Sequence, residues 1–348
     1  MTNDGLHDAV ELRVRALAEE RWKWARQHVR ELAELRREPL SRFEERLLVR
    51  WRRPLTMFEA VLELSMQLGE TYNRVHRRSA ARRQDFVFEA LTRLHARALL
   101  TASEVLALLR TGHASGANAR WRTMHEISVV AQFLSKHGGP TAERYLLFDV
   151  VAREKAARNY QEFAVRLGER ALSKRTLQRL RTTRSRLERR FGKQFSAGEQ
   201  GWAAADFNLN RPVTIRDLEE DVGLPHLRPR YLMASHPVHA GPRGVIWSLE
   251  EWPTGVLPAG PSNSGLADPA AGTLVTLNQL NATLVLRQVK RVPVDWYATY
   301  VVEIDAMARL LDDACTAFMR VQRQLQREDR RIYRANRRYV RANVGPSR

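Results

Sequence analysis

The residues best able to do chemistry lie together in segment 119–127, which contains Arg120, Arg122, His125 and Glu126. On a helix, Arg122, His125 and Glu126 share one face because they are three and four positions apart. Arg120 lies about 140° around the axis from His125, a separation that long side chains partly close. A phosphate-binding guanidinium and a histidine acting as acid or base are the groups that a metal-independent ribonuclease uses. The spacing therefore makes these four residues candidate catalytic residues.

A structural alternative stays open for the same segment. An R-x4-H spacing is expected by chance in an arginine-rich chain with ten histidines, and Arg122 with Glu126 is an ordinary i,i+4 pair. Catalysis is favoured by the surroundings, because unpaired charge is costly within a helix of dense apolar content. A buried structural ion pair would have the same pattern. The apolar residues of this helix are Trp121, Met124, Ile127, Val129, Val130, Phe133 and Leu134.

A second histidine-bearing segment, Tyr231 to His239, adds His239 as a fifth candidate catalytic residue. His236 and His239 are three positions apart, but Pro237 between them disturbs helical geometry and no third metal ligand is evident. We therefore predict no metal site. A neutral histidine reaching the Arg122 face is expected, either as a catalytic group or as a core hydrogen-bonding partner.

The formal net charge of +19 and the sequence pI of about 11.0 favour a polyanionic partner such as RNA or DNA, and two basic helical faces together favour RNA. Only six of the 58 basic residues are lysines, which codon bias explains, but bias does not explain the excess over 39 acidic residues. Two helical faces concentrate the charge, and for either face the alternative is an ordinary solvated surface or a site for an acidic protein. The two predicted nucleic-acid-binding sets are Arg323, Arg327, Arg330, Arg334, Arg337 and Arg341, with Tyr333 and Tyr339 interleaved for base stacking, and Arg175, Arg179, Arg186 and Arg190.

Apolar periodicity predicts an all-α, multi-helix bundle with long N-terminal and C-terminal helices. Residues 192–272 are richer in Gly, Pro, Ser and Asn, which predicts loops with short helices. We divide the chain into an N-terminal helical region 1–80, a bundle domain 81–290 and a basic C-terminal helix 291–348. The expected helices are 6–37, one from about 41 with a kink or break at Pro54, 83–109, 117–135, 141–167, 173–191, 273–289 and 293–341.

Composition also excludes several classes of protein. The single cysteine, Cys315, precludes an internal disulfide, and no stretch has the length and apolar character of a membrane span or signal peptide, so we expect a cytoplasmic protein with no membrane partner. The Gly-rich residues 255–272 lack the lysine and strand context of a phosphate-binding loop. Neither a Gly-x-Ser-x-Gly nor a His-Glu-x-x-His motif occurs, and no cofactor is expected.

The stretch from Leu94 to Ala204 resembles an uncharacterised bacterial domain family. The similarity rests on segments 94–97, 119–126, 142–145 and 201–204, with a further match at 231–241. That family is similar to the HEPN helical-bundle group, many of whose members are ribonucleases in toxin–antitoxin and phage-defence systems. The resemblance implies a helical bundle, often a homodimer, whose R-x4-6-H arginine and histidine face a shared cleft.

Only Arg120 and His125 carry over from that resemblance to catalytic roles. The sequence departs from the active pattern at Trp121, where active members usually place a small polar residue, and at Glu126 beside the histidine. Two hypotheses follow. The first is a HEPN-like endoribonuclease, or an RNA-binding relative that has lost activity, in bacterial defence. The second is a non-catalytic helical subunit that binds nucleic acid or an acidic partner.

Overall fold

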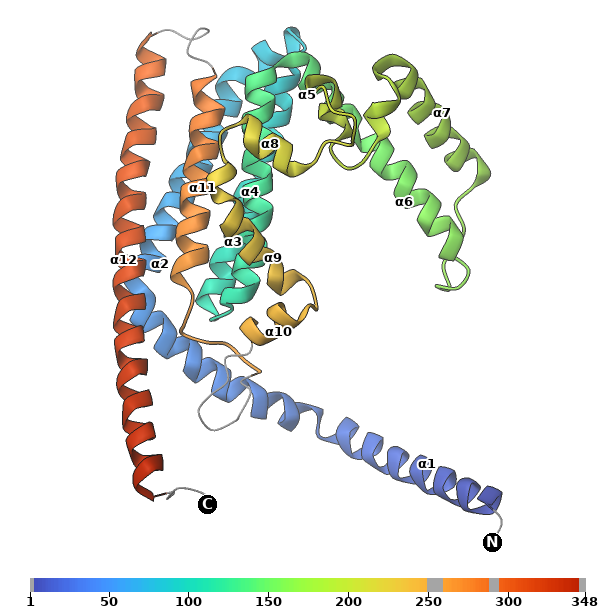
Figure 1. Cartoon of the computed structure of the whole chain (residues 1–348), viewed down its shortest axis with the longest axis vertical. Coiled ribbons are helices and arrows are strands. Elements are labelled where there is room, and N and C mark those ends of the chain that lie inside the picture. Colours follow the sequence, from blue (N-terminus) through green and yellow to red (C-terminus); the bar gives the residue numbers. More distant parts are fainter. Residues whose placement is uncertain (1–2, 249–258, 288–293, 344–348) are drawn as a thin grey trace. The chain divides into compact units, whose positions relative to one another are not determined.

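The computed structural model describes residues 3–248, 259–287 and 294–343 (Figure 1). Within these ranges it contains twelve α-helices, four short 3-10 helices and no strands, so the predicted all-α multi-helix bundle is confirmed. The elements are α1 (Asn3–Gln27), α2 (Val29–Arg82), α3 (Phe86–Arg110), α4 (Ala114–His137), α5 (Gly139–Leu147), α6 (Asp149–Phe163), α7 (Lys174–Phe191), η1 (Lys193–Ser196), η2 (Gly201–Asp206), α8 (Ile215–Asp221), η3 (Pro225–Leu227), α9 (Arg228–Ser235), η4 (His236–Val238), α10 (Pro242–Ser248), α11 (Ala267–Leu286) and α12 (Val294–Asn343).

The chain divides into two compact units, Met1–Arg52 and Arg53–Arg348. The smaller unit holds α1 and the first part of α2, and the larger unit holds the rest of α2 and every later helix. The organisation into regions 1–80, 81–290 and 291–348 stays a prediction.

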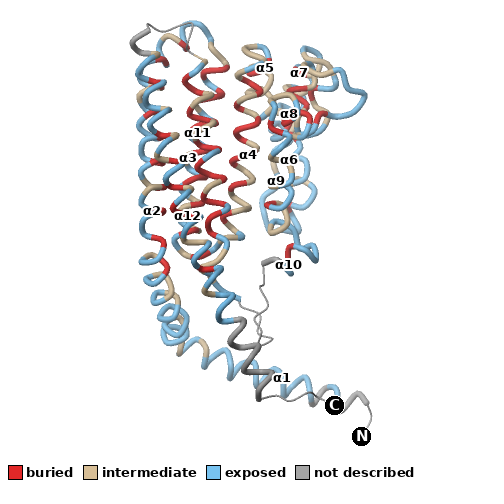
Figure 2. Tube along the Cα trace, turned by 60° about the vertical axis from the view of Figure 1, so that its left-hand side comes forward, coloured by how far each residue is buried: buried red, intermediate tan, exposed pale blue. Residues whose placement is uncertain are grey.

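The core of the larger unit is built on α3, α4 and α11, which pack on one another, while α12 packs on α11. Figure 2 shows the buried positions gathered along these helices. α11 is apolar around most of its circumference, as expected for a helix enclosed by others. Its buried residues run from Ala267 to Val285. This core fixes α4, which carries the candidate site.

A buried polar network joins four helices of this bundle. Asn281 of α11 accepts a hydrogen bond from His95 Nε2 of α3 at 2.8 Å and donates to Ser65 Oγ of α2 at 2.8 Å. Asn281 Nδ2 also lies 3.6 Å from Met307 Sδ of α12. Gly69 of α2 makes room for the imidazole, because a Cβ there would lie 2.7 Å from His95 Cε1. Since buried polar groups need partners, this network specifies how the four helices align.

The N-terminal helices differ from the prediction. The helical pattern breaks at His28, whose ring Nδ1 donates to the Trp24 carbonyl at 2.7 Å, and the next helix, α2, passes through both Pro39 and Pro54. The predicted helix end before Pro39 is therefore wrong, and of the kink or break predicted at Pro54 the break does not occur. Around Pro54 the side chains of Trp51, Leu55 and Phe58 are buried, and this burial offsets the cost of a helical proline, about 3 kcal/mol. Nothing in the structure explains the continuity at Pro39.

The later helices follow the sequence more closely. α3, α4 and α7 lie within a few residues of their predictions, and Ser173 caps α7 by accepting from the Thr176 amide at 3.1 Å. The single helix predicted for 141–167 is wrong, because the chain forms α5 and α6 with a break at Phe148, whose ring packs edge-on to Phe195 at 5.6 Å. In the described residues 192–248 and 259–266 the chain does form short helices and loops, and α11 then begins at Ala267.

Candidate functional site

His125 lies in the middle of α4 and is sealed from solvent. Its side chain is 1% exposed, and its Nε2 donates to Glu219 Oε1 of α8, which is 0% exposed, at 2.9 Å. The second carboxylate oxygen of Glu219 accepts from Arg228 of α9 at 3.0 Å. Burial lowers the pKa of His125 below its usual value, against the opposing effect of Glu219. The imidazole is therefore neutral at neutral pH and is held in its Nε2–H form.

A second polar group lies beside this pair and also joins α4 to α9. Arg122 donates to the Tyr231 hydroxyl at 2.8 Å, and that hydroxyl donates to Glu126 Oε1 at 2.6 Å. Arg122 and Glu126 also form an ion pair at 3.1 Å. Burial, and next the Glu126 carboxylate, raise the pKa of Tyr231 to about 12. We call Arg122, His125, Glu126, Glu219, Arg228 and Tyr231 the His125 cluster.

Aromatic packing encloses the imidazole of the His125 cluster, whereas Arg122, Glu126 and Arg228 are partly exposed. The His125 ring lies between Trp121, at 5.8 Å, and Tyr231, at 5.5 Å between ring centroids. Trp121 is itself buried against α11, where its Nε1 donates to Thr276 at 3.2 Å. A Cβ on Gly272 of α11 would lie 2.7 Å from Trp121 Nε1, so this helix approaches the indole only because the position is glycine.

The structure does not bring Arg120 and His125 together. Arg120 forms an ion pair with Glu104 of α3, whereas His125 bonds to α8. The two side chains, about 140° apart around α4, therefore do not meet, because each bonds to a partner on a different neighbouring helix. Arg122 and Glu126 do share a cluster with His125, as their three- and four-residue spacing predicts.

The prediction for His239 is not met by its position. His239 is exposed after η4, and within the described residues it makes no side-chain hydrogen bond or ion pair with the His125 cluster. The partner that reaches His125 is Glu219, and the partner that reaches Arg122 is Tyr231. The carboxylate of Glu219 and the phenol of Tyr231 therefore make the contacts that were predicted for a histidine.

Sequence reasoning missed Glu219 and Arg228 altogether. Glu219 lies 94 positions from His125, within the short acidic helix α8, where Asp217, Glu220 and Asp221 offer the same chemistry. The only local signal in the sequence is the neighbouring Leu218, an apolar residue among acidic ones. In the structure Leu218 is fully buried, so this part of α8 faces the core. Leu218 could have marked a buried face, but not which helix it packs on.

A second unpredicted cluster lies at the end of α4. His137 Nε2 donates to Asp221 Oδ2 at 2.9 Å, and its Nδ1 lies 3.8 Å from Asp206 Oδ1. Arg144 of α5 donates to Asp206 Oδ2 at 2.6 Å, and Lys136 bonds to Asp221. Although burial acts to raise it, the bonds from His137 and Lys136 hold the pKa of Asp221 below its usual value. This cluster fastens η2 and α8 to α4 and α5, with each charge matched by an opposite one.

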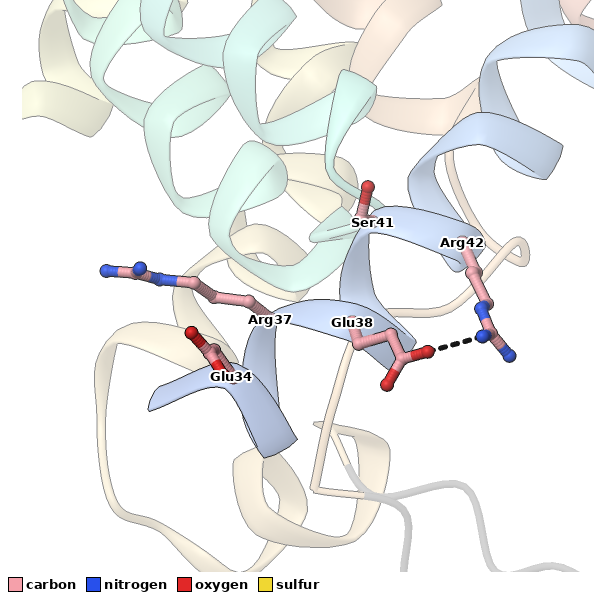
Figure 3. A pocket seen from close by; sticks show the side chains of 5 residues that line it. All are labelled: Glu34, Arg37, Glu38, Ser41 and Arg42. Atoms are coloured by element: carbon pink, nitrogen blue, oxygen red, sulfur yellow. Dashed lines mark hydrogen bonds and ion pairs between the residues drawn. The ribbon is translucent and has the colours of Figure 1, made fainter. Parts of the chain in front are cut away.

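The chemistry open to the His125 cluster is limited by access. Glu219 orients His125 as a carboxylate orients the base of a catalytic triad, yet neither group is open to solvent. The surface pocket in Figure 3 lies elsewhere, on α2 in the smaller unit, and is lined by side chains of that one helix: Glu34, Arg37, Glu38, Ser41 and Arg42. Within the described ranges, no three or more His, Cys, Asp or Glu side chains are grouped to hold a metal ion. The geometry therefore favours a structural role for the His125 cluster, and its catalytic role stays a prediction.

The predicted basic face of α7 is exposed along its length. α7 has eight basic residues and one acidic residue, Glu188, which is bound to Arg184 at 2.8 Å. Arg184 also bonds to Glu154 of α6 at 2.8 Å, so this arginine serves the packing of α7 on α6. We call Arg175, Arg179, Arg186 and Arg190 the α7 arginine face; all four are exposed.

The members of the α7 arginine face differ in their partners. Arg190 forms an ion pair with Glu143 of α5 at 2.8 Å. Arg175, Arg179 and Arg186 form no ion pair with any described residue. Because they lie within about 40° of one another around the helix, three uncompensated guanidinium groups share one side of α7.

The predicted basic face of α12 is only partly described. Arg323, Arg327 and Arg330 are exposed and form no ion pair within the described part of the chain. The predicted residues whose side chains lie outside that part are Tyr333, Arg334, Arg337, Tyr339 and Arg341. In its described part, α12 therefore carries exposed arginines without acidic partners, as α7 does.

Among the described residues, no helix has the length and apolar character needed to cross a bilayer.

Comparison with known proteins gives one match. Residues 88–252 match a family described as "Family of unknown function (DUF5677)". No curated protein and no solved structure matches the chain. The predicted likeness of residues 94–204 to an uncharacterised domain family is thereby confirmed, and the matched segment contains both the His125 cluster and α7.

Proposed function

We propose that this chain is an RNA-binding protein that contacts the phosphate backbone through the α7 arginine face, and that it binds without cleaving. The observation that carries the proposal is the set Arg175, Arg179 and Arg186, three exposed guanidinium groups with no acidic partner among the described residues. Exposed arginines on one helix face suit a phosphate backbone, because each can donate two hydrogen bonds to a phosphate. The net charge of +19 adds a long-range attraction for polyanions.

The predicted resemblance to the HEPN group, drawn from the sequence, is what favours RNA as the polyanion, and with it a cytoplasmic role in bacterial defence or stress. Arg323, Arg327 and Arg330 of α12 offer a second surface of the same chemistry. The sealed state of His125 argues for binding without turnover, because a general acid or base must reach the substrate directly or through a water molecule. A HEPN-like endoribonuclease is the alternative, and it requires the His125 cluster to open.

Fluorescence anisotropy of the full chain with labelled RNA tests the proposal. The triple variant R175E/R179E/R186E should weaken RNA binding about 30-fold or more, and the slope of log K against log salt should fall by about two to three. The matched control is R74E/R77E/R78E on α2, which changes the net charge equally at other exposed arginines. A control that weakens binding as much as the test variant would reduce the effect to net charge and overturn the proposal.

Two further arms identify what binds. DNA of the same sequence serves as competitor, and a preference for DNA would overturn the assignment to RNA. If no RNA binds at about 10 μM protein and 50 mM salt, the proposal fails and an acidic protein becomes the favoured partner.

Incubation with total RNA tests the nuclease alternative. We expect no cleavage by the parent chain. Cleavage that is lost in both H125A and R120A would establish the R-x4-H pair as catalytic and contradict binding without turnover.

A further inference from the structure

Helix α1 carries a strip of apolar side chains that are exposed in the described part of the chain. Val10, Val14, Leu17 and Trp24 lie within about 80° of arc on this 25-residue helix. Val14 is 57% exposed and Leu17 is 46% exposed, although both are large aliphatic side chains. Figure 2 shows α1 exposed along nearly its whole described length. We call these four residues the α1 seam.

An exposed helix of this kind needs a partner. In proteins, most of the stability of a helix comes from tertiary packing of its apolar face. Two intrahelical ion pairs, Arg15 with Glu11 and Lys23 with Glu19, add a few tenths of a kcal/mol each. These pairs lie away from the seam and leave it free. The seam therefore marks a surface for another helix.

The charges beside the seam specify that helix. Arg13 and Glu20 lie on the same flank, within about 20° of each other around the axis, and neither forms an ion pair within the described residues. The opposite flank carries Glu11, Ala18 and Ala25. When two identical helices pair antiparallel, like flanks meet, so Arg13 of each copy faces Glu20 of the other. In a parallel pair unlike flanks meet, and Arg13 faces Ala18.

We propose that α1 pairs antiparallel with α1 of a second copy of this chain. The register that joins Arg13 to Glu20 places Val14 opposite Leu17 in both halves of the pair. It also aligns the two α1 helices over nearly their full length, because the centre of the pair falls near residue 16 and the helix runs from Asn3 to Gln27. Arg21 lies inside the same arc, and its guanidinium packs over the Trp24 ring at 4.1 Å, so the seam contains one cation held against an aromatic face.

This interface is independent of the proposed RNA binding. It lies outside the matched residues 88–252 and uses no residue of α7 or α12. A dimer would present two copies of the α7 arginine face, but neither proposal needs the other.

Light scattering on the full chain across a concentration series of about 1–100 μM tests the pairing. The parent should approach twice the chain mass of 40.1 kDa. V14D and L17D should each raise the dimer dissociation constant by about 100-fold or more, because two carboxylates then enter an apolar seam. The matched control is L12D, which replaces an equally apolar but off-seam residue, 75% exposed, and should leave the mass unchanged.

Charge reversal tests the orientation. R13E and E20R should each weaken the dimer about fivefold or more, and the double variant R13E/E20R should restore it, because the antiparallel pair then regains both ion pairs. Circular dichroism of each variant checks that α1 stays helical.

Three results would overturn the proposal. A parent chain that stays monomeric at 100 μM would show that the seam is covered by something other than a second copy. L12D acting like L17D would move the interface off the seam. A double variant no better than the single variants would exclude the antiparallel register.

Discussion

The arginines of the His125 cluster and those of α7 differ in whether an acidic side chain of the protein neutralises them. In the cluster, Arg122 meets Glu126 and Tyr231, and Arg228 meets Glu219, so each positive charge is balanced inside the protein. On α7, Arg175, Arg179 and Arg186 have no acidic partner among the described residues. An excess of arginine over acidic residues therefore indicates a binding surface only where the guanidinium groups have no partner within the protein. Charge balanced internally supports the fold, whereas charge left unbalanced on a surface is available to an external anion.

Removing the central acid of the His125 cluster should produce the largest effect on stability. E219A leaves the sealed His125 donor without an acceptor and the partly exposed Arg228 without its carboxylate, which should lower the free energy of unfolding by about 3 kcal/mol. Urea denaturation measures the change. RNA affinity of the folded variant should not change, and a loss of affinity at unchanged stability would reverse the roles given to the two regions.

Titration of His125 should change the stability of the protein less than E219A does. Burial holds the pKa of His125 below its unfolded value, so its contribution to stability is present above about pH 6.5 and is lost as the pH falls through that value. The unfolding free energy should therefore fall by up to about 1.4 kcal/mol per pH unit for this residue. Burial lowers the pKa of His95 and His76 as well, and these act in the same direction.

Urea denaturation at several pH values, with H125Q as the comparison, isolates the share of His125. The variant should show a shallower decline between pH 6.5 and 5 than the parent. Identical slopes would mean that His125 is not held neutral in the fold.

The smallest expected effect is a difference in RNA affinity between two single variants of the α7 arginine face. Arg190 is already paired with Glu143, whereas Arg179 has no partner among the described residues. R179A should therefore weaken RNA binding about threefold to tenfold, and R190A less than R179A. Anisotropy titrations of the two single variants, side by side, give the comparison. A larger loss for R190A would show that an internal ion pair does not remove an arginine from the binding surface.

Much of the fold could be predicted from local patterns. Apolar periodicity placed α3, α4 and α7, and Ser173 marked the start of α7, because both signals act within one or two turns of helix. Pro39 misled the prediction of a helix end, and α2 also continues unbroken through Pro54. A proline sets a local cost, but at Pro54 the burial of Trp51, Leu55 and Phe58 outweighs it, and that burial depends on the rest of the fold.

For the candidate site, helical spacing is enough to predict which polar residues share a face of α4 and which face of α7 is basic. The partners of these residues depend on how the helices pack: Glu219, 94 positions away, bonds to His125, Arg120 pairs with Glu104, and Arg190 pairs with Glu143. The two kinds of information differ in the distance along the chain over which they act. Periodicity and capping act between neighbours in the chain, whereas the partner of a buried charge is whichever opposite charge the packing of distant helices brings within about 3 Å.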